Sequence, residues 1–173
     1  MPTKADKINT KKKTAILDVG CGTGEILSTL ASKKGLILAG IDISPEIIKI
    51  ASEKANRNID FKIGDAEELP WKENCFDLII CTYSFHHYPR PEIALREMQR
   101  VLKPKGQVMI GDSWAPAPFR QLINFFSPVS KEGKVRVYAK SEVDYLLKEC
   151  GFKSFKWELL NKQTFFTTAR ADK

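Results

Sequence analysis

The sequence has no long hydrophobic run. Its 173 residues contain apolar stretches of strand length only, and the first thirteen residues are polar and rich in lysine. A membrane-spanning helix needs about 20 consecutive apolar residues, and a secretory signal needs an apolar core behind a charged start. We therefore expect no membrane span and no signal peptide, and a cytoplasmic protein.

Cysteine and histidine are also scarce. The chain has four cysteines and two histidines, and the histidines, His86 and His87, are adjacent. No two cysteines form a C-x-x-C pair; they are Cys21, Cys75, Cys81 and Cys150. Structural zinc sites and disulfide frameworks need closely spaced ligands or matched pairs. The sequence therefore predicts free thiols and no metal site.

The net charge of +7 is unevenly distributed. Residues 1–13 hold five lysines against one aspartate, and residues 114–173 hold eleven basic against six acidic residues. Residues 14–113 hold twelve basic against fourteen acidic residues. The two basic ends could form a surface for an anionic acceptor, a nucleic acid or an acidic lipid. We favour the simpler interpretation, which is solvated surface lysines.

The most informative stretch is Ala15–Glu25, AILDVGCGTGE. A short apolar run typical of a buried strand contains Asp18 near its end and is followed by Gly20, Gly22 and Gly24, after which a helical pattern begins. Glycines allow positive φ angles and a close approach of the backbone to a ligand, and a helix start presents free N–H groups. This arrangement predicts a cofactor site.

The spacing of the glycines favours a particular kind of cofactor. The dinucleotide fingerprint places its third glycine where this chain has Glu25, and a carboxylate there repels a pyrophosphate. Asp18 adds a second negative charge at the end of the strand. Asp42 ends a second apolar run about twenty residues after the turn, where a carboxylate can accept both hydroxyls of a ribose. The pattern therefore indicates a nucleoside cofactor that carries a positive charge.

The rest of the chain alternates between strand and helix patterns. We expect strands over residues 14–19, 36–41, 59–63, 76–81 and 107–111, and helices over residues 25–34, 46–56, 91–102 and 141–150. Two alternating segments at 152–160 and 163–170 predict a hairpin. Alternating strands and helices are typical of an α/β protein with a parallel sheet.

These motifs resemble those of the class I S-adenosylmethionine-dependent methyltransferases. The first motif of that family matches at Asp18, Gly20, Gly22 and Gly24, and later matches are GDAEELPW from Gly64 and VLKPKGQVMIGD from Val101. The resemblance implies a doubly wound, mostly parallel, seven-stranded sheet with helices on both faces and a C-terminal antiparallel hairpin. The length predicts one domain over residues 14–173, and the polar residues before it predict a basic arm at 1–13. The resemblance implies an acceptor-side insertion at 114–140.

The resemblance implies S-adenosylmethionine as the cofactor and a role for each matching residue. Asp18 and the turn around Gly20 would hold the amino-acid end, Asp42 the ribose, and Ile43 one adenine face. The full expected cofactor site is Asp18, Gly20, Cys21, Gly22, Asp42, Ile43, Asp65, Ala66, Thr82 and Tyr83. Asp65 and Ala66 would meet the adenine edge, and Thr82 and Tyr83 would lie under the methionine chain. His87 is the expected catalytic base, ahead of His86.

Within the family, the chain is most similar to the small-molecule branch that includes the ubiquinone and menaquinone C-methyltransferases. That branch implies methyl transfer to a small-molecule acceptor, whose identity the sequence leaves open. One alternative is an RNA methyltransferase that uses the basic ends, although CTYS at Cys81 replaces the Pro-Pro-aromatic loop of enzymes that methylate base amino groups. Another is a non-catalytic cofactor-binding or partner-activating subunit. Family members usually carry helices before the first strand, so we also expect an open site, or a lid supplied by an oligomer or a partner.

Overall fold

The computed structural model describes residues 14–173 apart from 56–57, 128 and 131–132. The predicted basic arm at 1–13 lies outside the described residues. No helix within the described ranges is long and apolar enough to cross a bilayer.

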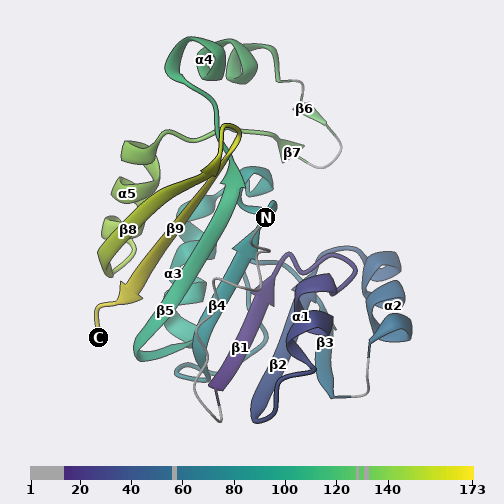
Figure 1. Ribbon diagram of the computed structural model, residues 1–173. Coiled ribbons are helices and arrows are strands. Elements are labelled where there is room, and N and C mark those ends of the chain that lie inside the picture. Colours follow the sequence, from purple (N-terminus) through teal and green to yellow (C-terminus); the bar gives the residue numbers. More distant parts are fainter. Residues whose placement is uncertain (1–13, 56–57, 128, 131–132) are drawn as a thin grey trace.

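A seven-stranded sheet forms the centre of the molecule (Figure 1). Its strands, in spatial order, are β3 (Ile59–Ile63), β2 (Leu36–Asp42), β1 (Thr14–Val19), β4 (Phe76–Thr82), β5 (Leu102–Ser113), β9 (Thr164–Ala171) and β8 (Phe152–Asn161). The first five run parallel, while β9 is antiparallel to both of its neighbours. The predicted mostly parallel sheet with a C-terminal antiparallel hairpin is therefore confirmed.

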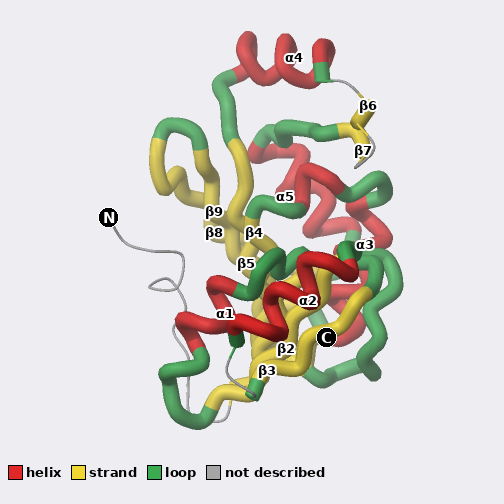
Figure 2. The backbone as a smooth tube through the Cα atoms, turned by 90° about the vertical axis from the view of Figure 1, so that its right-hand side faces the viewer, coloured by secondary structure: helices red, strands yellow, loops and turns green. Residues whose placement is uncertain are grey.

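The central strands are apolar because helices cover both faces of the sheet. The helices are α1 (Glu25–Leu30), α2 (Pro45–Lys54), α3 (Pro91–Val101), α4 (Ala117–Phe126) and α5 (Lys140–Glu149), with a 3₁₀ turn, η2, at Phe85–His87. Leu27 and Ile48 of α1 and α2 share one apolar cluster, and residues of α3 and α5 share the other. Figures 1 and 2 show the two pairs on opposite faces, as predicted.

Two predicted elements differ from the observed ones by several residues. The first helix ends at Leu30 rather than at residue 34. Near this end the Thr29 hydroxyl donates to the Glu25 carbonyl, and the Ser32 hydroxyl donates to the Thr29 carbonyl. Such bonds compete with helix continuation. Strand β5 begins five residues before and ends two residues after the predicted strand, because Leu102 already pairs with Phe76 of β4, and Asp112 and Ser113 still pair with β9.

The segment between β5 and α5 lies at one end of the molecule, beyond the tip of β5 (Figure 1). It contains α4 and the short pair β6 (Val129–Ser130) and β7 (Gly133–Lys134). Among the described residues of this segment, α4 has no buried side chain. This segment corresponds to the insertion expected at 114–140.

Candidate functional site

The three glycines form a tight turn at the carboxyl end of β1. Gly20, Gly22 and Gly24 have φ angles of 70°, 53° and 71°, which a residue with a Cβ rarely adopts. The N–H groups of Gly20 and Cys21 both donate to the carbonyl of Ile41 on β2, at 2.9 and 3.0 Å. The turn is thereby fastened to the end of the neighbouring strand.

Two carboxylates lie beside this turn. Asp42 Oδ2 accepts the Gly22 N–H at 2.9 Å, and Oδ1 accepts the Ser44 N–H at 3.1 Å. Asp18, on β1, is only 1% exposed. Burial, followed by the charges of Asp18 and Asp42, raises the pKa of the Cys21 thiol well above its usual range. The turn therefore lies in a negative field, which suits a cationic ligand.

Gly22 leaves an open space in front of the turn. A Cβ at Gly22 would have no atom within 4 Å, whereas one at Gly20 would lie 2.4 Å from Ser84 Cβ, and one at Gly24 2.6 Å from the Phe61 ring. Gly20 and Gly24 thus serve the packing of the protein itself. The space at Gly22, bordered by the Asp42 carboxylate, is open to a ligand that approaches the backbone closely.

The predicted adenine-side residues gather at the ends of β2 and β3. Asp42 pairs in register with Ile63, and the Gly64 N–H donates to the Asp42 carbonyl at 3.0 Å. Ile43 is exposed and Ala66 is buried. Asp65 is exposed, and its Oδ1 accepts the Glu67 N–H at 2.9 Å, so one carboxylate oxygen stabilises the local turn. These residues flank the Asp42 side of the glycine turn.

Thr82 ends β4, but the next residue turns away from β1. Tyr83 has a φ of 53°, its N–H donates to the Gly111 carbonyl, and its hydroxyl lies 3.0 Å from Thr164 Oγ1 on β9. In the sheet order, β9 is three strands away from β1. The Tyr83 side chain is therefore directed toward β9.

A polar cluster that the sequence analysis did not identify packs against the turn. Ser84 Oγ donates to the Val19 carbonyl at 3.0 Å and lies 3.1 Å from the Tyr88 hydroxyl. Cys81 Sγ lies within 3.5 Å of both hydroxyls. Burial raises the pKa of Tyr88 and raises the pKa of Cys81 to about 12. The cluster is thus neutral at physiological pH and fixes the loop after β4 against β1.

The structure pairs His86 with a carboxylate. His86 Nδ1 lies 2.6 Å from Asp112 Oδ1, and the His86 N–H donates to Asp112 Oδ2 at 2.9 Å. Asp112 is 1% exposed and lies near the end of β5. The two histidine rings lie side by side, with centroids 4.0 Å apart. Asp112 was missed, although it repeats the pattern of Asp18 and Asp42, a carboxylate near the carboxyl end of a parallel strand.

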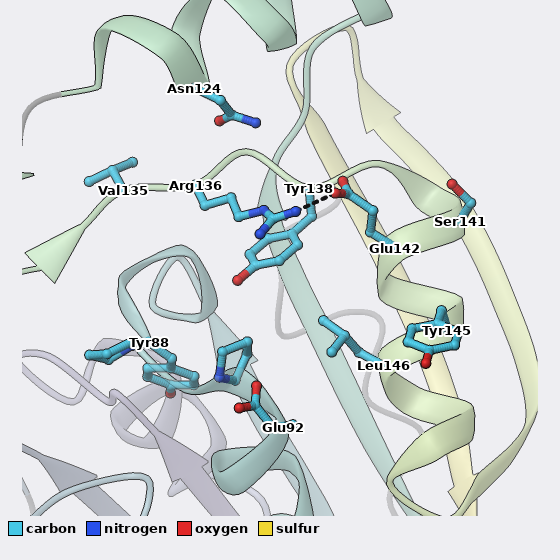
Figure 3. Close-up of a pocket in the computed structure, with 12 residues that line it drawn as sticks. Tyr88, Glu92, Asn124, Val135, Arg136, Tyr138, Ser141, Glu142, Tyr145 and Leu146 are labelled. Atoms are coloured by element: carbon cyan, nitrogen blue, oxygen red, sulfur yellow. Dashed lines mark hydrogen bonds and ion pairs between the residues drawn. The ribbon is translucent and has the colours of Figure 1, made fainter.

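A cavity of about 730 Å³ opens beside this loop (Figure 3). It is lined by three tyrosines, Tyr88, Tyr138 and Tyr145, together with Leu146 and other residues of α3, α4 and α5. The Arg136 guanidinium lies over the Tyr138 ring and pairs with Glu142 at 2.5 Å. Because the Tyr88 hydroxyl belongs to the Ser84 cluster, this one residue links the cavity to the glycine turn.

Comparisons with known proteins agree with this geometry. The family model "Methyltransferase domain" matches residues 10–151. The demethylmenaquinone methyltransferase of Staphylococcus aureus is 33% identical over 141 residues, which cover 78% of this chain and 58% of that protein. The chain therefore spans less than two thirds of the length of this relative.

Two solved structures share the fold at moderate sequence identity. A SAM-dependent methyltransferase from Aquifex aeolicus has a TM-score of 0.75 and 26% identity, over 92% of this chain and 83% of that one. A SAM-dependent methyltransferase from Methanosarcina mazei has a TM-score of 0.76 and 25% identity, over 94% of both chains. The chain belongs to the class I S-adenosylmethionine-dependent methyltransferases.

Proposed function

From this family membership, we propose that the chain transfers a methyl group from S-adenosylmethionine, held at the glycine turn, to a small-molecule acceptor with a quinol or phenol ring. The observation that carries the proposal is the open space at Gly22 beside the Asp42 carboxylate. The ring class of the acceptor is suggested by the demethylmenaquinone relative. We also propose residues 14–173 as one catalytic domain.

The carboxylates explain the choice of cofactor. Each oxygen of Asp42 already accepts one backbone N–H, at 2.9 and 3.1 Å, which orients the carboxylate and leaves lone pairs for ribose hydroxyls. Asp18 and Asp42 together favour a positively charged ligand over a pyrophosphate. Ile43, Asp65 and Ala66 complete the adenine side of the proposed site.

The chemistry requires mainly positioning. When bound, S-adenosylmethionine supplies a methyl group on a positively charged sulfur, which an electron pair of the acceptor can attack directly. The protein then has to align the two reactants, which accounts for much of the rate in such reactions. The cavity beside Tyr88 is the proposed place for the acceptor. Tyr88 lines this cavity, and its hydroxyl also bonds with Ser84, in the loop that packs against the glycine turn.

A hydroxyl acceptor must also lose its proton. We propose His86 as the base, because Asp112 binds its Nδ1 and orients the ring, which leaves Nε2 to accept the proton. His87, the residue favoured from sequence, is the alternative. Asp112 acts here as a positioning residue.

Thermal unfolding tests the choice of cofactor. S-adenosylmethionine and S-adenosylhomocysteine are expected to raise Tm, because a ligand that binds only the folded state stabilises it. Nicotinamide dinucleotides serve as the control, and equal stabilisation by NAD would overturn the proposal. Turnover with a labelled methyl donor, against quinols and against a nuclease-treated metabolite extract, then tests the acceptor class.

A further inference from the structure

Helix α4 (Ala117–Phe126) is amphipathic, and its apolar side faces away from the protein. At 100° per residue, its apolar side chains occupy an arc of about 160°. That arc consists of Pro118, Phe119, Leu122, Ile123, Phe125 and Phe126. Phe125 and Phe126 are 81% and 69% exposed, and the other large side chains of the arc are also exposed.

The polar side of α4 attaches the helix to the protein. Asn124 Nδ2 donates to the Val137 carbonyl at 2.9 Å, and the Val137 N–H donates back to Asn124 Oδ1 at 2.8 Å. Arg120 donates to the Ala115 carbonyl at 3.3 Å. Figure 3 shows Asn124 pointing from the helix toward the chain that leads to Tyr138.

This orientation is the reverse of that in the other helices of the fold. Helix α5 buries Val143 and Leu147, and α3 buries Leu95 and Met98. A surface helix normally turns its apolar stripe toward the core. Clustered exposed apolar side chains mark an interaction surface, so the outward stripe of α4 is a docking face.

The charge of the segment around α4 indicates which kind of surface the helix binds. No carboxylate occurs between Ser113 and Ser130, and Arg120 is the only charged residue of the helix. Up to Ala139 the sequence adds Lys131, Lys134 and Arg136 against Glu132. A helix with phenylalanine and leucine on one side, in a stretch of sequence with a net positive charge, is typical of helices that lie in the interface of an anionic membrane.

Other occupants fit this face less well. Residues 1–13 are too polar to cover it, with Met1 and Ile8 as their only large apolar side chains. A second copy would bring two surfaces of the same positive sign together. The helix also lies at the end of the molecule in Figure 1, where a flat surface can reach it.

We propose that α4 docks the protein on an anionic lipid surface, with its apolar side among the acyl chains near the headgroups. This inference goes beyond methyl transfer and does not depend on the identity of the cofactor. Asn124 and Val137 would hold the helix above the cavity, so that docking places the cavity close to the bilayer.

The test is co-sedimentation of the full chain with vesicles. We expect binding to vesicles that contain phosphatidylglycerol, weaker binding to pure phosphatidylcholine, and a decrease as ionic strength rises. Leu122→Glu/Phe126→Glu is expected to lower the affinity at least about tenfold, since each apolar side chain contributes more than 1 kcal/mol when buried. This variant should fold, because α4 buries none of its described side chains.

The matched control is Ile37→Glu/Leu159→Glu, which makes the same change at two exposed apolar residues of the sheet. It should bind vesicles like the unmodified chain. Absence of binding to phosphatidylglycerol vesicles, or binding that the α4 variant retains, would overturn the proposal. A dimer in light scattering that the α4 variant dissociates would assign the face to a second copy instead. Stabilisation by S-adenosylhomocysteine, measured in parallel, separates failure of docking from failure of the proposed cofactor site.

Discussion

The glycine turn and the segment at 114–139 are built in opposite ways. The turn is fastened by backbone N–H groups to Ile41 and Asp42, and Asp18 beside it is buried. In the distal segment, residues 114–139, backbone bonds from Trp114 and Arg136 hold the two ends, but α4 between them is held by the side chain of Asn124 and exposes its apolar residues.

If the proposed assignments hold, the contrast separates two tasks. A cofactor site must hold one molecule in one geometry, and strand ends joined by hydrogen bonds provide that rigidity. An acceptor side must suit one particular acceptor, and an insertion attached at a few points can vary without disturbing the sheet. Substitutions in one region should therefore leave the other unchanged.

The largest expected effect is at the histidine pair. If His86 is the base for a hydroxyl acceptor, His86→Ala should lower kcat by about 10²–10⁴ while the affinity for S-adenosylhomocysteine is unchanged. His87→Ala should lower kcat only a few-fold. Steady-state kinetics over a range of pH measure kcat for both histidine variants and for Asp112→Asn. A larger loss of kcat in His87→Ala than in His86→Ala would assign the role of base to His87.

The next effect concerns the carboxylate of Asp42. Asp42→Asn retains an oxygen for one backbone N–H but loses the charge, and charge-assisted bonds contribute about 1.5–3 kcal/mol each. The affinity for S-adenosylhomocysteine should fall at least about tenfold. Calorimetric titration measures the change, and Asp60→Asn, at an exposed carboxylate on β3, is the control. An affinity that does not change would show that the ribose is held elsewhere.

A smaller effect is expected on stability. Gly20→Ala places a Cβ 2.4 Å from Ser84 Cβ at a φ of 70°, so backbone strain and overpacking add. The free energy of unfolding should fall by about 2–4 kcal/mol. Gly22→Ala places its Cβ in open space, so only the backbone strain remains. Its free energy of unfolding should fall by about 1–2 kcal/mol. Denaturant titration compares the two, and an equal loss would contradict the assigned packing role of Gly20.

The smallest effect concerns thiol reactivity. Burial raises the pKa of Cys21 and of Cys81, the latter to about 12, so little thiolate forms at pH 8. Cys75 is the least buried of the four cysteines. Iodoacetamide should therefore modify Cys75 first, as peptide mass analysis would show. Rapid modification of Cys21 would indicate that the glycine turn opens in solution.

The sequence was a good guide where local pattern determines structure. The apolar run before Gly20, the glycine spacing and the strand ending at Asp42 predicted the turn between β1 and β2, because strands and tight turns depend on nearby residues. The cap of α2 is equally local, since Ser44 Oγ accepts the N–H of Ile47, three residues on, at 3.3 Å.

Contacts between distant residues were not predictable. Asp112 and His86 are 26 residues apart, and their pairing depends on how β5 lies against β4. The direction of Tyr83 depends on its positive φ angle and on Thr164, far along the chain. The amphipathic pattern of α4 is visible in the sequence, but the pattern alone does not say that Asn124 faces the protein.

The central claim is that the space in front of Gly22 receives S-adenosylmethionine. Gly22→Ala and Gly151→Ala both place an alanine at a positive φ angle, 53° and 81°. Gly151 follows α5, and the atoms nearest to a Cβ there belong to the flexible Gln99 side chain. Calorimetric titration with S-adenosylhomocysteine is predicted to show binding to the unmodified chain and to Gly151→Ala, with the affinity of Gly22→Ala at least about tenfold weaker. Equal affinities for the two variants would contradict the account.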